Sequence, residues 1–224
     1  RPHAPNLATA AVTHGCGFVD AAERQLDLHW SALSTHCGDH ADDRFWAHAE
    51  PLELSSGGQR SGAVRTLSLA PAHELVHILG HGLRWNSVPS IRWIPDAAMV
   101  IASAAKGPRF DWPLFLHEVE ARGLGVGVAP ALVELGRYDI PVPAEVVAAM
   151  QRMRVRPLDR LRLEHSLWPW DRKKPLRVIA YDAWRFCEGL PPREAMTRLA
   201  RYAWFRMAPD GRIASIPAQL AAKL

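Results

Sequence analysis

"LSLAPAHELVHILGHGLRW", residues 67–85, is the stretch where the character of the chain changes. Up to about residue 70, the sequence contains short runs of alternating apolar and polar residues, which are typical of strands. Pro71 suits the first turn of a helix, and the following residues keep helical spacing to about Trp85. We therefore expect an α+β protein, with a small N-terminal β portion followed by a mostly α-helical domain.

The first part of the β portion, residues 10–33, contains two extended runs. In "QLDLHW", Leu26 and Leu28 face one side of the strand and Asp27 and His29 face the other, because successive side chains of a strand alternate. An edge strand with one solvated side would have the same pattern. A strand also aims its side chains rigidly, so this acid and this imidazole are candidate site residues.

The other elements are predicted from turn and cap signals. Residues 51–69 are expected to form a hairpin with a glycine-rich turn. Helices are expected over residues 42–49, 90–105, 112–122, 126–137, 143–154, 157–165, 176–187 and 192–207, with Asp111 as an N-cap and Gly123 as a stop. Residues 166–175, with two prolines, are expected to be a linker. The expected parts are 1–70, 71–165 and 166–224.

Composition narrows the class of protein only slightly. The net charge of +4 over 224 residues fits an anionic ligand and equally a merely soluble surface. The longest basic run is "DRKK" at 171–174, so nucleic acid is not an expected partner. Three separated cysteines without CxxC spacing indicate a reduced, cytoplasmic protein. No apolar run reaches the ~18 residues of a membrane span, so no membrane partner is expected.

Within the expected helix, His73-Glu74-Leu75-Val76-His77 spells the HExxH pattern of zinc peptidases. Two histidines at i and i+4 stand on one helical face and can bind zinc, and the glutamate then acts as the base. A third ligand has no recognised spacing here, although Asp96 or Glu118 could serve. A zinc metallopeptidase is therefore one hypothesis, and a helix with a histidine-rich polar face is the alternative.

A second signal is the order of several short motifs along residues 20–150. "QLDLHW" is followed by "RFWAHAEPLEL", "LSLAPAHELVHILGHGLRWNSVPSIRWIPDAAMVI", "FDWPLFLHEVEARGLGVGVAPALVEL" and "IPVPAEVV". This succession resembles a family of uncharacterised nucleotidyltransferases in the polymerase-β superfamily. Members have a D/E-L-H-W strand, an L-hydrophobic-H-x-x-x-H-G helix, a W…L/I-R-W-x-x-D stretch, a D-W helix and a closing P-x-P. His77 and His81-Gly82 match the helix motif.

The resemblance implies a metal-dependent transfer of a nucleotidyl group from an NTP to an acceptor that the sequence does not identify. In this superfamily, three carboxylates hold two Mg²⁺ ions, which activate the nucleophile and stabilise the pyrophosphate. Asp27 matches the third acid, so the resemblance makes it the catalytic and metal-binding residue. Because that acid works inside the superfamily's active site, we expect Asp27 to face a cleft between sheet and helices.

The G-S…D-x-D element that carries the other two carboxylates in the family is not in this sequence. The chain begins with Arg1 rather than Met, so we expect an N-terminally truncated enzyme that is inactive alone. A non-catalytic helical binding module is the remaining hypothesis.

Four further residues are candidate substrate contacts: His29, His81, Arg92 and Asp96. Gly82 would let the helix that carries His81 approach another backbone closely, so that the imidazole reaches a substrate. Arg92 and Asp96 are four residues apart on one helical face, and we expect them to form an ion pair worth a few tenths of a kcal/mol. Arg92 could instead face a triphosphate, since guanidinium groups bind phosphate oxygens well.

Overall fold

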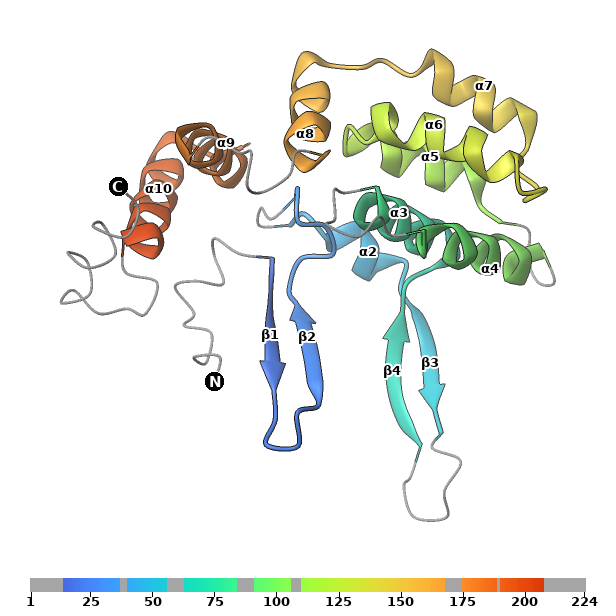
Figure 1. Cartoon of the computed structure of the whole chain (residues 1–224), viewed down its shortest axis with the longest axis horizontal. Coiled ribbons are helices and arrows are strands. Elements are labelled where there is room, and N and C mark those ends of the chain that lie inside the picture. The colour runs from blue at the N-terminus through green and yellow to red at the C-terminus, as the bar shows by residue number, and fades with distance from the viewer. Residues whose placement is uncertain are drawn as a thin grey trace. The chain divides into compact units, whose positions relative to one another are not determined.

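The computed structural model confirms the α+β class (Figure 1). It describes residues 14–36, 40–55, 63–83, 91–105, 110–167, 175–188 and 190–207. The turn of the second hairpin, most of the expected linker 166–175, Trp85 and the residues after 207 lie outside this range. Among the described helices, none combines the length and the apolar character needed to cross a membrane.

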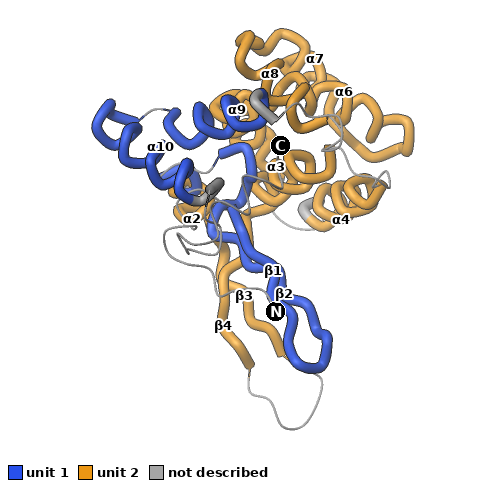
Figure 2. Tube along the Cα trace, turned by 60° about the vertical axis from the view of Figure 1, so that its left-hand side comes forward, with its two compact units in different colours: residues 1–42, 173–224 blue, residues 43–172 orange. Residues whose placement is uncertain are grey.

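The chain forms two compact units (Figure 2). Unit 1 contains Arg1–Asp42 and Lys173–Leu224, and unit 2 contains Asp43–Arg172. These groupings differ from the expected parts 1–70, 71–165 and 166–224. The second hairpin belongs with the helices that follow it, and the last two helices belong with the first hairpin. Such associations between distant segments depend on packing and leave no local signal in the sequence.

Unit 1 begins with an antiparallel hairpin of β1 (Gly15–Val19) and β2 (Gln25–His29). Its turn is held by Asp20, whose carboxylate accepts hydrogen bonds from the backbone amides of Ala22 and Arg24. The Arg24 side chain also donates to it at 2.6 Å, and these contacts lower the pKa of Asp20. The alternation in "QLDLH" is thus a regular strand, as predicted.

Unit 1 also contains the helices α9 (Pro175–Cys187) and α10 (Pro192–Met207), which pack against each other. The rings of Phe186 and Tyr202 lie 5.7 Å apart at this contact, and the Tyr202 hydroxyl donates to Asp182 at 3.1 Å. Arg185 donates to the backbone carbonyl of Ser34, which ties the segment after β2 to α9.

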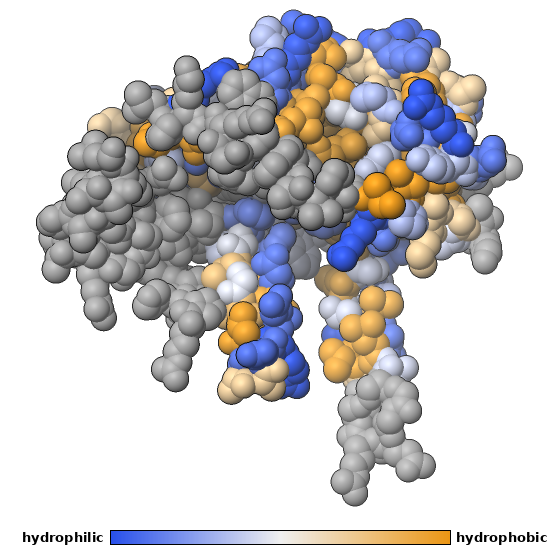
Figure 3. Space-filling model, in the orientation of Figure 1, coloured by the Kyte–Doolittle hydropathy of each residue, from blue (hydrophilic) through white to orange (hydrophobic). Residues whose placement is uncertain are grey.

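Unit 2 begins with the short helix α2 (Asp43–Ala47) and an antiparallel hairpin of β3 (Glu50–Leu54) and β4 (Val64–Ser68). Apolar side chains on this hairpin are exposed, as Figure 3 shows. Leu52, Leu54 and Val64 share one face, because Leu54 pairs with Val64 and Leu52 with Thr66.

In the described part of unit 2, six further helices follow, and they begin and end within a few residues of the predicted positions. They are α3 (Pro71–Gly82), α4 (Trp93–Ala105), α5 (Trp112–Ala121), α6 (Gly125–Gly136), α7 (Ala144–Arg152) and α8 (Pro157–Leu167). α3 contacts α4, α5 and α6, and its Leu75, Val76 and Leu79 are fully buried. This central helix therefore carries His73, the first residue of the HExxH pattern, into the core.

The boundaries of α5 follow the predicted signals. The Asp111 carboxylate accepts a hydrogen bond from the Leu114 amide at 2.8 Å, which caps the first turn. After the last turn, Gly123 has φ +62° and the Leu124 amide bonds to the Val119 carbonyl. A left-handed residue at this place ends a helix, and glycine adopts it without steric strain.

Gly82 of α3 lies close to the side chain of a residue at the start of α4. A Cβ atom built on Gly82 would lie 2.3 Å from the Cβ of Trp93, the first residue of α4. Only glycine allows α3 and the start of α4 to be this close.

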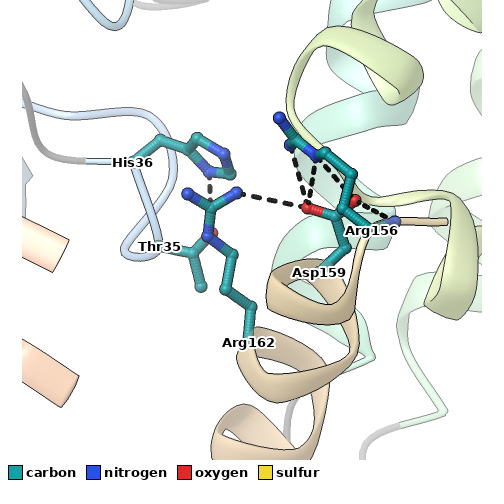
Figure 4. A network of polar contacts seen from close by, with 5 residues as sticks. All are labelled: Thr35, His36, Arg156, Asp159 and Arg162. Atoms are coloured by element: carbon teal, nitrogen blue, oxygen red, sulfur yellow. Dashed lines mark hydrogen bonds and ion pairs between the residues drawn. The ribbon is translucent and has the colours of Figure 1, made fainter. Parts of the chain in front are cut away.

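The start of α8 is held by a buried carboxylate, shown in Figure 4. Asp159 accepts hydrogen bonds from the backbone and side chain of Arg156, and Arg162 lies 3.6 Å away. Burial would raise the pKa of Asp159, but these hydrogen bonds and positive charges lower it overall. A Cβ at Gly123 would lie 2.1 Å from this carboxylate, so the turn after α5 fits closely against α8.

Candidate functional site

The first candidate site is a pair of polar side chains on β2. Nε2 of His29 lies 2.9 Å from Oδ2 of Asp27, and both residues project from the same face of the strand. The Asp27 side chain is 69% exposed and that of His29 is 28% exposed. The carboxylate is therefore accessible to a ligand from solvent, although one of its oxygens already has a partner.

The imidazole of His29 is enclosed by the neighbouring strand. Gly15 is its partner across the ladder, and a Cβ at Gly15 would lie 2.5 Å from Cδ2 of the ring. The ring of His14 meets it edge to face, with centroids 4.9 Å apart. Gly17 stands opposite Asp27, and a Cβ there would have no neighbour within 4 Å.

The cleft expected around Asp27 is not formed by the described residues of its own unit. Asp27 projects from a hairpin of two strands and has no second carboxylate among its described contacts. Across the described part of the chain, no three His, Cys, Asp or Glu side chains are grouped so that they could hold a metal ion. One exposed carboxylate supplies too few oxygen ligands for two Mg²⁺ ions.

The HExxH histidine His73 forms part of a second cluster, in unit 2. His73 is fully buried, and its ring lies 4.7 Å from that of Phe45 and 5.1 Å from that of His48, measured between centroids. Neither ring nitrogen has a hydrogen-bond partner among the described residues, and Nε2 lies 3.8 Å from Oε1 of Glu118. His73 thus fills the core between α2, α3 and α5.

Glu118 is the charged centre of this cluster. Its carboxylate is buried and accepts a hydrogen bond from Nε of Arg122 at 3.1 Å. Nε of Arg44 lies 2.8 Å from the other oxygen, as an ion pair outside hydrogen-bond geometry. The Arg122 guanidinium also lies 4.1 Å from the centre of the Phe45 ring, a favourable cation–π distance. Two arginines therefore compensate one buried carboxylate.

The electrostatics favour a neutral His73. Burial lowers the pKa of His73, because a charged imidazole loses its hydration in the core. The Glu118 carboxylate acts in the opposite direction, and His48 and Arg122 add to the lowering.

The other two histidines of α3 and its one acid lie nearer the surface. Glu74 lies in the first turn of α3 and most of its side chain is exposed. Partial loss of hydration of its carboxyl group raises its pKa, and the nearby Asp96 carboxylate raises it further. The rings of His77 and His81 lie 4.5 Å apart, one turn from each other. Because α3 and α4 pack against each other, the Asp96 carboxylate lies close enough to Glu74 to act on it electrostatically.

The predicted ion pair between Arg92 and Asp96 is not present among the described contacts. Both side chains are exposed at the start of α4, where the Asp96 amide bonds to the Arg92 carbonyl. An exposed pair gains little and loses side-chain freedom, which explains why it need not form.

The predicted site residues fall in two groups. Asp27 and His29 contact each other in unit 1, while His81, Arg92 and Asp96 belong to unit 2, where Arg92 directly precedes α4. Sequence reasoning did not single out His14, Gly15, Arg44 or Arg122. Only Arg122 had a local signal, its spacing of four residues from Glu118.

No model of a protein family, no curated protein and no solved structure matches this chain.

Proposed function

We propose that the chain is part of a metal-dependent nucleotidyltransferase and that Asp27 supplies one of the carboxylates that bind Mg²⁺. The observation that carries this proposal is the carboxylate on the regular strand β2, exposed to solvent and held at one oxygen by His29. A strand fixes the direction of its side chains, as a metal ligand requires. The resemblance of residues 20–150 to the nucleotidyltransferase family supplies the reaction.

In this proposal Asp27 shares the metal ions with two further carboxylates from a polypeptide segment outside these 224 residues. The Mg²⁺ ions, when bound, activate the acceptor's nucleophile and stabilise the leaving pyrophosphate. The role of this chain in the proposal is to hold one of the metal ligands in place. His81, Arg92 and Asp96 are the proposed contacts to the NTP or the acceptor.

The zinc peptidase hypothesis has less support. A catalytic zinc keeps one coordination position open to water and substrate. His73 is fully buried against Phe45 and Glu118, and Glu118 is engaged by Arg44 and Arg122. Exposing His73 to a substrate would require the core of unit 2 to open.

The test is Mn²⁺ binding, with Mn²⁺ in place of Mg²⁺ because both prefer oxygen ligands and Mn²⁺ broadens nearby NMR signals. In the 224-residue chain we expect Mn²⁺ to broaden the amide signals of β2. Asp27→Asn should abolish this effect, while Glu23→Gln, at an exposed acid in the turn of the same hairpin, should leave it in place.

A catalytic assay completes the test. The 224-residue chain with Mg²⁺ should release no pyrophosphate from any of the four NTPs, because two carboxylates are missing. If this chain alone transferred a nucleotidyl group with Mg²⁺, the proposal that two further carboxylates must come from another segment would be wrong. Broadening of β2 that persists in Asp27→Asn would contradict the role of Asp27 and favour a non-catalytic binding module.

A further inference from the structure

We propose that the junction of α7 and α8 binds the sugar–phosphate backbone of a double-stranded nucleic acid through a cluster of exposed arginines. This cluster, called here the arginine patch, consists of Arg152, Arg154, Arg156 and Arg160, all of which are exposed. The arginine patch belongs entirely to unit 2, and its role is independent of the proposed function.

Local structure directs the arginine patch outward. Arg152 is the last residue of α7, and Met153 after it is extended, with its sulfur 2.9 Å from a Cβ built on Gly125 of α6. Since successive side chains of an extended segment point to opposite sides, Arg154 is directed away from α6. The helix α8 follows at once and carries Arg160 near its start (Figure 1). The arginines are thus held on or beside two helices that begin and end at fixed positions.

The positive charge of the arginine patch is only partly compensated. Residues 152–164 contain five arginines, no lysine and two acids, Asp159 and Glu164. Asp159 is engaged by Arg156, whose side chain nevertheless remains 48% exposed (Figure 4). The other three members of the patch form no ion pair within the part of the chain that the structure describes. Their guanidinium groups therefore offer an excess of positive charge to an anionic partner.

The chemistry of the arginine patch favours nucleic acid over a protein or a membrane. Guanidinium groups match phosphate oxygens bidentately, and protein surfaces that bind DNA are polar and strongly positive. A protein interface would contain aromatic or other large apolar anchors, and a membrane-binding surface would contain apolar side chains that enter the lipid. Residues 144–167 contain no Phe, Tyr or Trp, and Val155 and Leu161 beside the arginines are only 38% and 39% exposed.

The same composition indicates a duplex rather than a single strand, because proteins bind single strands by stacking bases on aromatic side chains. Contacts to phosphates carry no sequence information, so duplexes of unrelated sequence should bind equally well. The sequence did not predict this partner, because no two of these arginines are adjacent and they form no basic run.

The experiment measures the affinity of the 224-residue chain for a mixed-sequence DNA duplex by fluorescence anisotropy at several salt concentrations. Each phosphate that a side chain neutralises adds about −0.9 to the slope of the logarithm of the association constant against the logarithm of the salt concentration. Three to four such contacts predict a slope of about −3, which is a loss of affinity of roughly 60-fold between 50 and 200 mM salt.

Two double variants with the same change in net charge provide a matched comparison. Arg152→Gln with Arg154→Gln should reduce the magnitude of the slope by about 2, since each lost phosphate contact reduces it by about 1. Arg65→Gln with Arg137→Gln removes the same charge from exposed positions on β4 and at the end of α6, and should leave the slope unchanged. Arg152→Lys with Arg154→Lys keeps the charge and should retain the slope, which separates loss of charge from loss of structure.

Three results would overturn the inference. The first is that the chain does not bind the duplex at the lowest salt concentration, or that its slope is unaffected when Arg152 and Arg154 are replaced by glutamine. The second is an equal reduction in the Arg65 and Arg137 variant, which would show that net charge alone drives binding. The third is tighter, arginine-dependent binding to poly-glutamate or to phosphatidylserine vesicles, which would make an acidic protein or a membrane the partner. None of these results bears on Mn²⁺ binding at Asp27, which tests the proposed function separately.

Discussion

Each unit of this protein contains a pairing of one acid with one histidine, and the two pairings differ in almost every physical respect. Asp27 and His29 are neighbours on an exposed strand, joined by a short contact of 2.9 Å. His73 and Glu118 come from different helices, are fully buried, and lie 3.8 Å apart. His73 of the HExxH motif belongs to the buried pair, so the match to a known motif did not show that this histidine is accessible.

The surroundings explain the difference. A buried carboxylate needs a nearby positive charge, because removing a charge from water costs several kcal/mol. Glu118 forms ion pairs with Arg44 and Arg122. An exposed pair contributes only about 0–1 kcal/mol to stability, so Asp27 can be changed without disturbing the fold. The buried pairing is consistent with a structural role, whereas the Asp27 carboxylate of the other pairing is largely exposed to solvent.

The largest change in stability is expected from a substitution in the buried pairing. Glu118→Gln should lower the free energy of unfolding by about 3–5 kcal/mol, because it leaves Arg122 as an uncompensated buried charge. Urea denaturation followed by far-UV circular dichroism measures this change.

Glu134→Gln is the matched control for that substitution. Glu134 forms an ion pair with Arg137 at 2.7 Å on the exposed surface of α6, and its loss should change stability by no more than about 1 kcal/mol. Equal effects of the two substitutions would show that Glu118 has no special role in the core.

The next largest change in stability is expected from a substitution where α3 packs against α4. Gly82→Ala should destabilise the protein by about 1–3 kcal/mol, because the added Cβ would lie 2.3 Å from that of Trp93. Gly136→Ala, in α6, meets no neighbour and should stabilise by about 0.4–1 kcal/mol. The thermal unfolding midpoints of the two variants should therefore shift in opposite directions. Shifts of the same sign would contradict the close contact between Gly82 and Trp93.

A smaller effect is expected from the protonation of His73, because the attraction of Glu118 opposes the effect of burial. Since the folded-state pKa of His73 is lowered from 6.5, the unfolded chain binds the proton more readily. Its contribution to stability is therefore present above about pH 6.5 and is lost as the pH falls toward the folded-state pKa. His73→Leu should have a flatter pH profile of urea stability between pH 8 and pH 5, and an unaltered profile would contradict this.

The smallest expected effect on stability is that of the exposed acid. Asp27→Asn should change the free energy of unfolding by less than about 0.5 kcal/mol, because the side chain is largely solvated. The same variant is expected to lose Mn²⁺ binding altogether. A large destabilisation would show that Asp27 is structural, and the contrast between the two pairings would disappear.

Much of the local structure could be predicted because its signals lie close together in the chain. Pro71 opens α3, Asp111 caps α5, and Gly123 ends it in the left-handed conformation. The alternation around Asp27 gives a strand on which Asp27 and His29 share a face. Each of these features depends on hydrogen bonds or steric limits within a few residues, so the sequence alone contains the information.

The character of each site, in contrast, was decided only by the tertiary structure. Nothing near His73 in the sequence indicates that Phe45 and Glu118 will enclose it, or that Arg44 will reach the same carboxylate. Likewise, the contact of Gly15 with His29 exists only because β1 pairs with β2 in one particular register. Burial and strand register bring together residues that are distant in the chain. These neighbours determine whether a charged side chain is paired with opposite charges in the core or remains exposed to solvent.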